Sequence, residues 1–303
     1  MSNWPSNYGA TCSKESLGLI LGLLGVIGFS LTLPATRMAV AYLDPVLVGL
    51  GRSVMAGALA AALLGITRQP LPSRAQIKSL MVVASGVIVG FPLFSAWAMQ
   101  RLPAAHGAIV VAILPLFTAI VGAIRLQERP APGFWLASAS GSLAVLAFAV
   151  WSGAGRLQAA DIALLIAAMA AAVGYAEGGR LAKQMGGWQV ICWALVLAAP
   201  FLLLPVALAI QRHGATAPIS AWVGFGYVSL ISQLLAFFLW YGGLALGGVV
   251  RVSQVQLLQP FLTIAASAVL LGERITPVML AFALVVVAAI AIGRRMPVAQ
   301  AAS

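Results

Sequence analysis

A few polar side chains lie in the middle of long apolar stretches, and they are the groups there that could form hydrogen bonds with a bound solute. Ser232 and Gln233 lie about halfway along one stretch, and Gln259 lies about halfway along another. An amide both donates and accepts hydrogen bonds, so glutamine can hold a carboxylate or an ammonium group without a fixed charge. We expect these three residues either to line a cavity or to form hydrogen bonds between helices. Gln254 and Gln256, nearer the end of their stretch, are weaker candidates.

Aromatic side chains in the same stretches could stack on an aromatic or apolar solute. Each one alone is more typical of helix packing or of the Trp and Tyr belts at membrane surfaces. As a group they predict an apolar wall for part of a cavity. They are Phe91, Phe94, Trp97, Tyr175, Trp240 and Tyr241.

Charged residues inside or beside the apolar stretches have two alternative roles. Arg52 could contact a carboxylate of a solute, but a structural role, with its long side chain reaching the membrane surface, is favoured. Glu177 and Arg180 have the three-residue spacing of a local ion pair on a helix. Glu128 and Glu273 follow apolar stretches, and we expect them to cap and pair neighbouring helix ends.

The elements that hold these residues are membrane-spanning helices. Of the 303 residues, 62% are hydrophobic and 8% are charged, whereas a soluble domain carries about 25% charged residues. A membrane span needs about 20 mostly apolar residues. Such stretches occur at 17–38, 45–66, 79–101, 104–124, 134–151, 159–180, 188–210, 221–245, 250–271 and 276–293. We therefore predict an all-α integral membrane protein, with ten transmembrane helices in a single membrane domain over 1–303.

The charge distribution argues against nucleic-acid binding and indicates sidedness. The net charge is +11, but the basic residues are scattered singly and form no patch with interleaved aromatics. With the N-terminus inside, eleven Lys and Arg lie on the inner side and five on the outer side. Because cytoplasmic loops carry the excess of Lys and Arg, both termini are predicted to be cytoplasmic, in a multi-pass protein of the inner membrane. Two cysteines and two histidines, far apart in the sequence, predict no metal site and no cofactor.

The sequence contains an internal repeat. The segments LQERPAP at 126–132 and LGERITP at 271–277 are 145 positions apart. The match predicts two five-helix repeats, 17–151 and 159–293. Because each repeat has an odd number of spans, the second copy is inverted relative to the first, an arrangement that lets two halves open alternately on opposite sides.

Three prolines lie inside the predicted spans. Pro115 and Pro260 correspond at the repeat offset, and Pro92 lies in the third span. Proline removes a backbone donor and frees a carbonyl, which bends a helix. We expect helix hinges at all three, with static packing as the alternative.

These features resemble the drug/metabolite transporter superfamily, in particular its EamA-type members with ten helices, over roughly 17–293. The repeated Leu-x-Glu-Arg-x-x-Pro element, the paired prolines, the turn Leu102–Ala105 and the Gly51-Arg52 pair carry the resemblance. Within the superfamily the chain is most similar to the aromatic amino acid exporters. The resemblance implies a central cavity between the halves, lined mainly by helices 1, 3, 4, 6, 8 and 9, with helices 5 and 10 further out. It also implies export of amino acids and related metabolites.

We therefore expect a carrier that exports amino acids, mainly aromatic and other apolar ones, by alternating access. Proton coupling usually needs an ionisable group deep in the membrane. Five of the six acids lie at loops or helix ends, and the sixth, Glu177, lies near the inner surface. Facilitative uniport is therefore favoured, with a proton-coupled exporter of drugs or other small metabolites as the alternative. Two histidines and six acids give no convergent catalytic set, so no enzyme is expected. The expected partners are an amino acid and the lipid bilayer, for a monomer or weak homodimer.

Overall fold

The computed structural model describes residues 8–126, 129–130, 132–152, 156–294 and 298–299, and these are almost entirely helical. In chain order the elements are α1 (Tyr8–Ser30), α2 (Thr32–Val40), α3 (Pro45–Ile66), α4 (Arg74–Val83), η1 (Ala84–Gly90), α5 (Phe91–Met99), α6 (Ala104–Val111), α7 (Leu114–Leu126), β1 (Arg129–Pro130), α8 (Pro132–Ser152), α9 (Ala159–Met185), α10 (Gly187–His213), α11 (Ile219–Tyr227), η2 (Val228–Leu235), α12 (Ala236–Gly247), α13 (Val249–Val252), η3 (Ser253–Leu258), α14 (Gln259–Leu271), α15 (Pro277–Arg294) and β2 (Val298–Ala299). The short strands β1 and β2 pair antiparallel.

The apolar helices confirm the predicted fold class, an all-α integral membrane protein. Within the described residues, seven helices are long and apolar enough to cross a membrane: Ser16–Val40, Pro45–Ile66, Arg74–Met99, Ala104–Gly122, Ala159–Met185, Gly187–His213 and Ile219–Gly247. Three shorter apolar helices, Ala139–Ser152, Val255–Leu271 and Pro277–Ala289, lie where the sequence predicts the remaining spans. Ten crossings and an inverted second half stay predictions.

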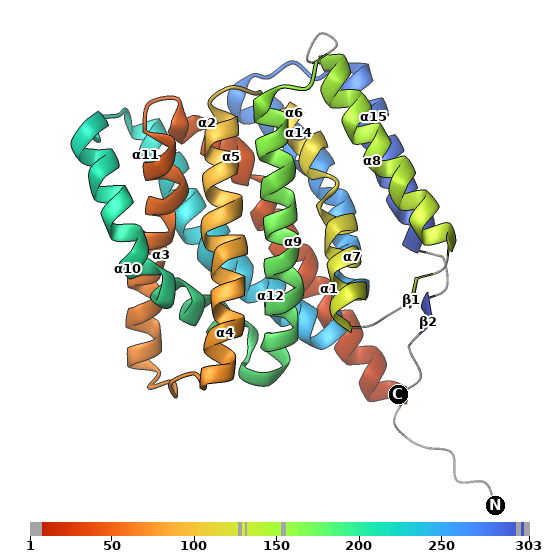
Figure 1. The fold of residues 1–303 in the computed structure, drawn as a ribbon, viewed down its shortest axis with the longest axis horizontal. Helices are drawn as coiled ribbons and strands as arrows, with labels where there is room; N and C mark the ends of the chain where they lie inside the picture. The colour runs from red at the N-terminus through yellow and green to blue at the C-terminus, as the bar shows by residue number, and fades with distance from the viewer. Residues whose placement is uncertain (1–7, 127–128, 131, 153–155, 295–297, 300–303) are drawn as a thin grey trace, which may run out of the picture.

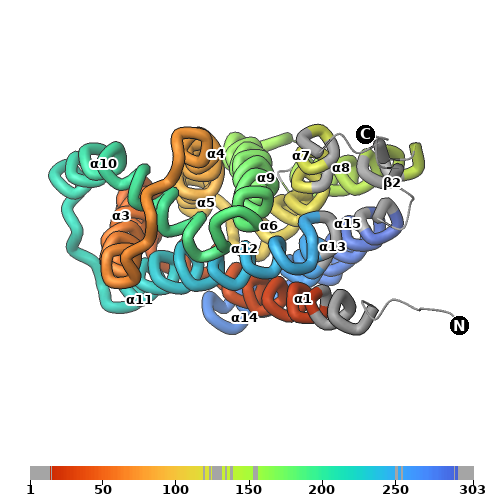
Figure 2. The backbone as a smooth tube through the Cα atoms, turned by 90° about the horizontal axis from the view of Figure 1, so that it is seen from below, coloured from red at the N-terminus to blue at the C-terminus, as the bar shows by residue number. Residues whose placement is uncertain are grey.

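Helices far apart in the sequence pack side by side. The pair α8 and α15 lies at one edge of the bundle, away from α3 and α10, which pack against each other at the other edge (Figure 1). Between these edges, α1 packs along α12, and α9 packs against α5 and α7 (Figure 2). A methyl group on Gly243 of α12 would lie 2.8 Å from the backbone nitrogen of Gly22 on α1, so glycine permits this close backbone approach.

Several helices change geometry near their middle, close to the predicted proline hinges. The π-helical turn η1 directly precedes α5, whose second residue is Pro92, and the 3-10 turn η3 precedes Pro260 in α14. The break between α6 and α7 lies just before Pro115. π-helical turns are rare and often occur at functional sites. The helices are thus irregular beside each proline, and their movement as hinges stays a prediction.

The end of the bundle where α2 ends and α6 begins is called the outer end below, following the predicted sidedness. It lies at the top of Figure 1, and the start of α4 lies at the opposite, inner end.

Candidate functional site

A buried polar cluster joins α2, α3 and η2 in the interior of the bundle. The Nε of Arg52 donates to Oε1 of Gln233 at 2.8 Å, and its Nη2 donates to Oγ of Ser232 at 3.2 Å. The Ser232 hydroxyl shares a 2.8 Å hydrogen bond with the hydroxyl of Thr32. Arg52 is only 2% exposed. We call these four residues the Arg52 cluster.

The irregular turn η1 supplies carbonyl oxygens that fix this cluster in place. The Nε2 of Gln233 donates to the carbonyl of Val87 at 3.0 Å, so both ends of its amide are engaged. Pro92 has no N–H with which to bond the carbonyl of Ile88, and the hydroxyl of Ser53 donates to that oxygen at 3.0 Å. Gln233 therefore links the Arg52 guanidinium to the backbone of η1 and fixes its position.

The positive charge of Arg52 has no carboxylate partner among the described residues. Their acidic side chains form ion pairs elsewhere: Asp44 with His213, Asp161 with His106, Glu177 with Arg180, and Glu273 with Arg37. Burying an unpaired charge is costly, and such groups usually pair with an opposite charge. Arg52 is therefore placed to receive an anionic group.

Four aromatic rings pack beside the Arg52 cluster. The ring centroids of Phe29 and Phe237 are 4.9 Å apart in an edge-on arrangement, and those of Tyr175 and Trp240 are 5.4 Å apart. Phe29 also stacks on Tyr175, with centroids 6.2 Å apart. Aromatic faces of this kind accept apolar and aromatic groups. We call these four residues the aromatic wall.

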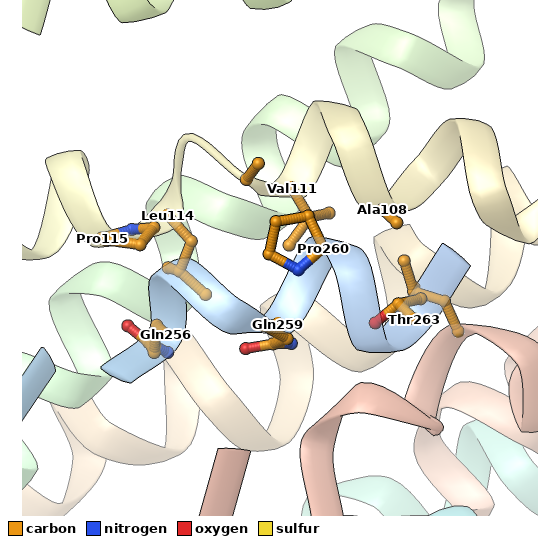
Figure 3. A pocket seen from close by; sticks show the side chains of 10 residues that line it. Ala108, Val111, Leu114, Pro115, Gln256, Gln259, Pro260 and Thr263 are labelled. Atoms are coloured by element: carbon orange, nitrogen blue, oxygen red, sulfur yellow. The ribbon is translucent and has the colours of Figure 1, made fainter. Parts of the chain in front are cut away.

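Two hollows meet at this place. The central hollow is lined by Thr32, Arg52 and Ser232, by three rings of the aromatic wall and by Phe91. The adjacent hollow lies between η3–α14 and the broken helix α6–α7, and Figure 3 shows the side chains that line it from these elements. Leu114 and Gln259 line both hollows, so the two lie next to each other. In this conformation each hollow has room for about one water molecule, about 10 Å³, so a larger solute requires the surrounding helices to move apart.

The structure brings together most of the residues that the sequence proposes for a cavity. Ser232, Tyr175 and Gln259 line the central hollow. Trp240 and Tyr241 are fully buried behind its surface, and the Tyr241 hydroxyl donates to a backbone carbonyl at 3.0 Å. Pro115 and Pro260 line the adjacent hollow, as does Gln256, whereas the side chain of Gln254 lies outside the described part.

Phe94 and Trp97 lie at a different place from the other proposed residues. They line an apolar hollow of about 410 Å³ between α3, α5 and α9, together with Pro45 and Ile162. The guanidinium carbon of Arg101 lies 3.9 Å from the centre of a Trp97 ring, a cation–π contact. These two aromatics therefore lie apart from the Arg52 cluster.

Other residues at the site differ from the sequence-based expectation. Arg52 does not reach the membrane surface, because its guanidinium is hydrogen bonded inside the bundle. Phe29, Thr32 and Phe237 line the central hollow without having been proposed for it. Phe29 could have been found, since the internal repeat aligns it with Tyr175 at an offset of 146.

The outer end carries a second polar network, in which the charges are paired. The two carboxylate oxygens of Glu273 accept hydrogen bonds from the backbone N–H groups of Ala104 and Ala105, both at 2.8 Å, and so cap α6. The Nε of Arg37 lies 3.2 Å from Glu273, and its Nη1 also donates to the carbonyls of Met99 and Leu102. The predicted capping role of Glu273 is confirmed, whereas Glu128 lies outside the described residues.

A buried His–Asp pair continues this network. The Nε2 of His106 lies 2.6 Å from Oδ1 of Asp161, with side-chain exposures of 5% and 0%. Oδ2 of Asp161 accepts from the backbone N–H of Gln158, which caps α9. Asp161 does lie in the first turn of its helix, as expected, but it is fully enclosed by protein. We call Arg37, Glu273, His106 and Asp161 the outer network.

The fold and this interior site define a multi-pass membrane protein with a small, partly polar chamber between its helices. The sequence model of the EamA-like transporter family matches residues 16–150 and again residues 158–293. The chain belongs to the EamA-like transporter family, within the drug/metabolite transporter superfamily, and is a transporter and not an enzyme. Its placement among the aromatic amino acid exporters stays a prediction.

Individual proteins show the same relationship. The chain is 43% identical over 284 residues to the uncharacterized transporter YdeK of Bacillus subtilis strain 168, covering 93% of this chain and 99% of that protein. It is 26% identical over 257 residues to a protein of Streptantibioticus cattleyicolor named "Probable terminal-alkyne amino-acid exporter", covering 83% and 84%. A solved crystal structure with 19% identity superposes with a TM-score of 0.65, covering 91% of this chain and 97% of that one, and so shares the fold.

Proposed function

We propose that this transporter exports amino acids with aromatic or other apolar side chains across the inner membrane, by alternating access and as a facilitative uniporter. The observation that carries the proposal is Arg52, a buried guanidinium without a carboxylate partner among the described residues, at the edge of an aromatic-lined hollow. The protein works as a monomer or weak homodimer with both termini in the cytoplasm.

An apolar amino acid matches the chemistry of the central hollow. Its carboxylate accepts hydrogen bonds from Arg52, and charge-assisted bonds of this type are among the stronger ones in proteins. Its side chain lies against Phe29, Tyr175 and Phe237, which line the same hollow. A cationic drug suits this place less well, because the nearest fixed charge is positive.

Two further findings support the proposal. A relative at 26% identity bears the name of an amino-acid exporter. The two successive matches to one family model, at 16–150 and 158–293, support a two-repeat architecture. Two similar halves that exchange conformations are a common basis for alternating access.

The outer network supplies the contacts that must break when the hollow opens outward. Glu273 joins α2, through Arg37, to the first turn of α6. These bonds hold the outer end closed, so release of an amino acid to the outside requires Glu273 to leave α6.

A proton-coupled exporter is the second candidate, and the buried His106–Asp161 pair favours it. Proton-coupled carriers use ionisable groups inside the membrane, and this pair lies between α6 and α9 with almost no exposure. In that mechanism, proton movement accompanies every transport cycle.

The two candidates separate in liposomes that contain the purified protein. We expect saturable uptake of radiolabelled L-phenylalanine without a pH gradient, counterflow driven by unlabelled phenylalanine, and no linked proton flux. Strict dependence on a pH gradient would replace uniport by proton coupling. A lack of uptake for every amino acid, with and without the gradient, would remove the amino acid assignment.

A further inference from the structure

Gln256 has an amide that is buried without a partner. Its side chain is 2% exposed, and within the described part of the chain neither Nε2 nor Oε1 has a hydrogen-bond partner. A buried polar group left without a partner destabilises the fold, so each case in a native protein calls for an explanation. Gln256 lines the adjacent hollow, where a ligand would reach it.

A break between two helices lies beside this hollow. The helix breaks between α6, which ends at Val111, and α7, which begins at Leu114. Pro115, in the position that would bond the carbonyl of Val111 in a continuous helix, has no N–H to donate. Val111 and Pro115 line the hollow from α6 and α7, and Gln256 and Gln259 line it from η3 and α14 (Figure 3).

The described lining of the adjacent hollow therefore carries polar groups but no charged side chain. Gln256, Gln259 and Val111, whose carbonyl Pro115 cannot bond, all line the hollow, and none of its described lining residues is acidic or basic. An ammonium group needs hydrogen-bond acceptors and does not require a full negative charge. Gln259, which lines both hollows, places these acceptors next to the hollow that contains Arg52.

We propose that Gln256, Gln259 and the backbone carbonyl of Val111 form a second subsite that binds the ammonium group of the substrate. This inference rests on the proposed function, in which Arg52 binds the carboxylate. The two subsites together recognise the zwitterionic head of an amino acid, and the aromatic wall receives its side chain. The transporter then distinguishes an amino acid from the same molecule without its amino group.

The test compares L-phenylalanine with 3-phenylpropionate, which keeps the ring and the carboxylate but lacks the ammonium group. The affinity of each compound is measured by its displacement of radiolabelled phenylalanine from the full-length protein in nanodiscs. The wild type should bind phenylalanine at least tenfold more tightly. Gln256→Leu, which keeps the volume and removes the acceptor, should weaken phenylalanine about tenfold and leave 3-phenylpropionate unchanged.

Gln189→Leu is the matched control. Gln189 also has a buried amide oxygen without a partner among the described residues, but it lies on α10 near the inner end and outside both hollows. Its variant should keep the wild-type preference. Gln259→Leu is a second variant that should reduce the preference for phenylalanine over 3-phenylpropionate. If neither cavity variant folds, the size of this preference in the wild type tests the subsite.

Each outcome has a distinct meaning. Equal wild-type affinities for the two compounds, or a Gln256→Leu variant that weakens both equally, would overturn the ammonium subsite while leaving an amino acid carrier in place. If the wild type binds neither phenylalanine nor any other amino acid, the proposed function itself fails. A preference that Gln256→Leu and Gln259→Leu reduce, and Gln189→Leu does not, supports the subsite.

Discussion

The Arg52 cluster and the outer network are both buried and polar, but they differ in charge balance. In the outer network Arg37 pairs with Glu273 and His106 pairs with Asp161. In the Arg52 cluster the guanidinium bonds, among the described residues, to two neutral side-chain oxygens. A paired buried charge fixes helices to one another. An unpaired buried charge destabilises the fold unless a ligand of opposite charge neutralises it. On the proposed function, this contrast separates the residues that stabilise the bundle from those that bind the substrate.

The largest effect is expected from removing a buried ion-pair partner. Asp161→Ala leaves His106 without its partner and α9 without a cap, and breaking a buried pair costs about 3 kcal/mol. We expect a clear fall in the thermal unfolding midpoint, with phenylalanine affinity unchanged in the folded fraction. His213→Ala is the control, because its pair with Asp44 is 60% exposed on the histidine side and should contribute little. If the Asp161→Ala variant kept wild-type stability but lost transport, the His106–Asp161 pair would instead be assigned to proton coupling.

Arg52→Gln should come next in size, because it removes the positive charge and keeps hydrogen-bonding capacity. A hydrogen bond to a charged group contributes about 1.5–3 kcal/mol, so phenylalanine affinity should fall about 10–100-fold. Equilibrium binding in nanodiscs measures this change. Arg101→Gln, on the surface beside Trp97, should bind normally. Wild-type affinity in the Arg52 variant would contradict the distinction between the two regions.

Glu273→Gln should have a smaller effect, on conformation and not on binding. It weakens the cap of α6 and the pair with Arg37 by about 1 kcal/mol, which favours outward opening about fivefold. A cysteine at Ala108, beside the adjacent hollow, reports this opening through labelling by a membrane-impermeant maleimide from outside, after Cys12 and Cys192 are changed to Ala. Unchanged labelling would mean that Glu273 does not hold the outer end closed.

The last prediction distinguishes the two aromatic groups. Tyr175→Ala removes one face of the central hollow, and aromatic contacts of this kind contribute about 0.5–1.5 kcal/mol. Its affinity for phenylalanine should fall severalfold to about tenfold. Trp97→Ala, at the separate apolar hollow, should change affinity less than about twofold. A larger loss in the Trp97 variant would move the binding place to the side of the bundle.

The sequence predicts the positions of the apolar helices well, because hydropathy and turn residues are local properties. It also finds Ser232, Gln233 and Gln259, since a polar group inside an apolar run is visible without a structure. It does not reveal that Arg52 points inward, because the alternative of reaching the membrane surface depends on how α3 and η2 pack. The His106–Asp161 pair was missed for the same reason, as its partners are 55 positions apart.

The most direct test of Arg52 as the carboxylate site compares L-phenylalanine with phenethylamine, which has the same ring and ammonium group but no carboxylate. Displacement of radiolabelled phenylalanine from nanodiscs gives both affinities in the wild type and in Arg52→Gln. The wild type should prefer phenylalanine by at least tenfold, and the variant should lose most of that preference because phenethylamine never used Arg52. A variant that keeps the full wild-type preference would contradict the assignment of Arg52.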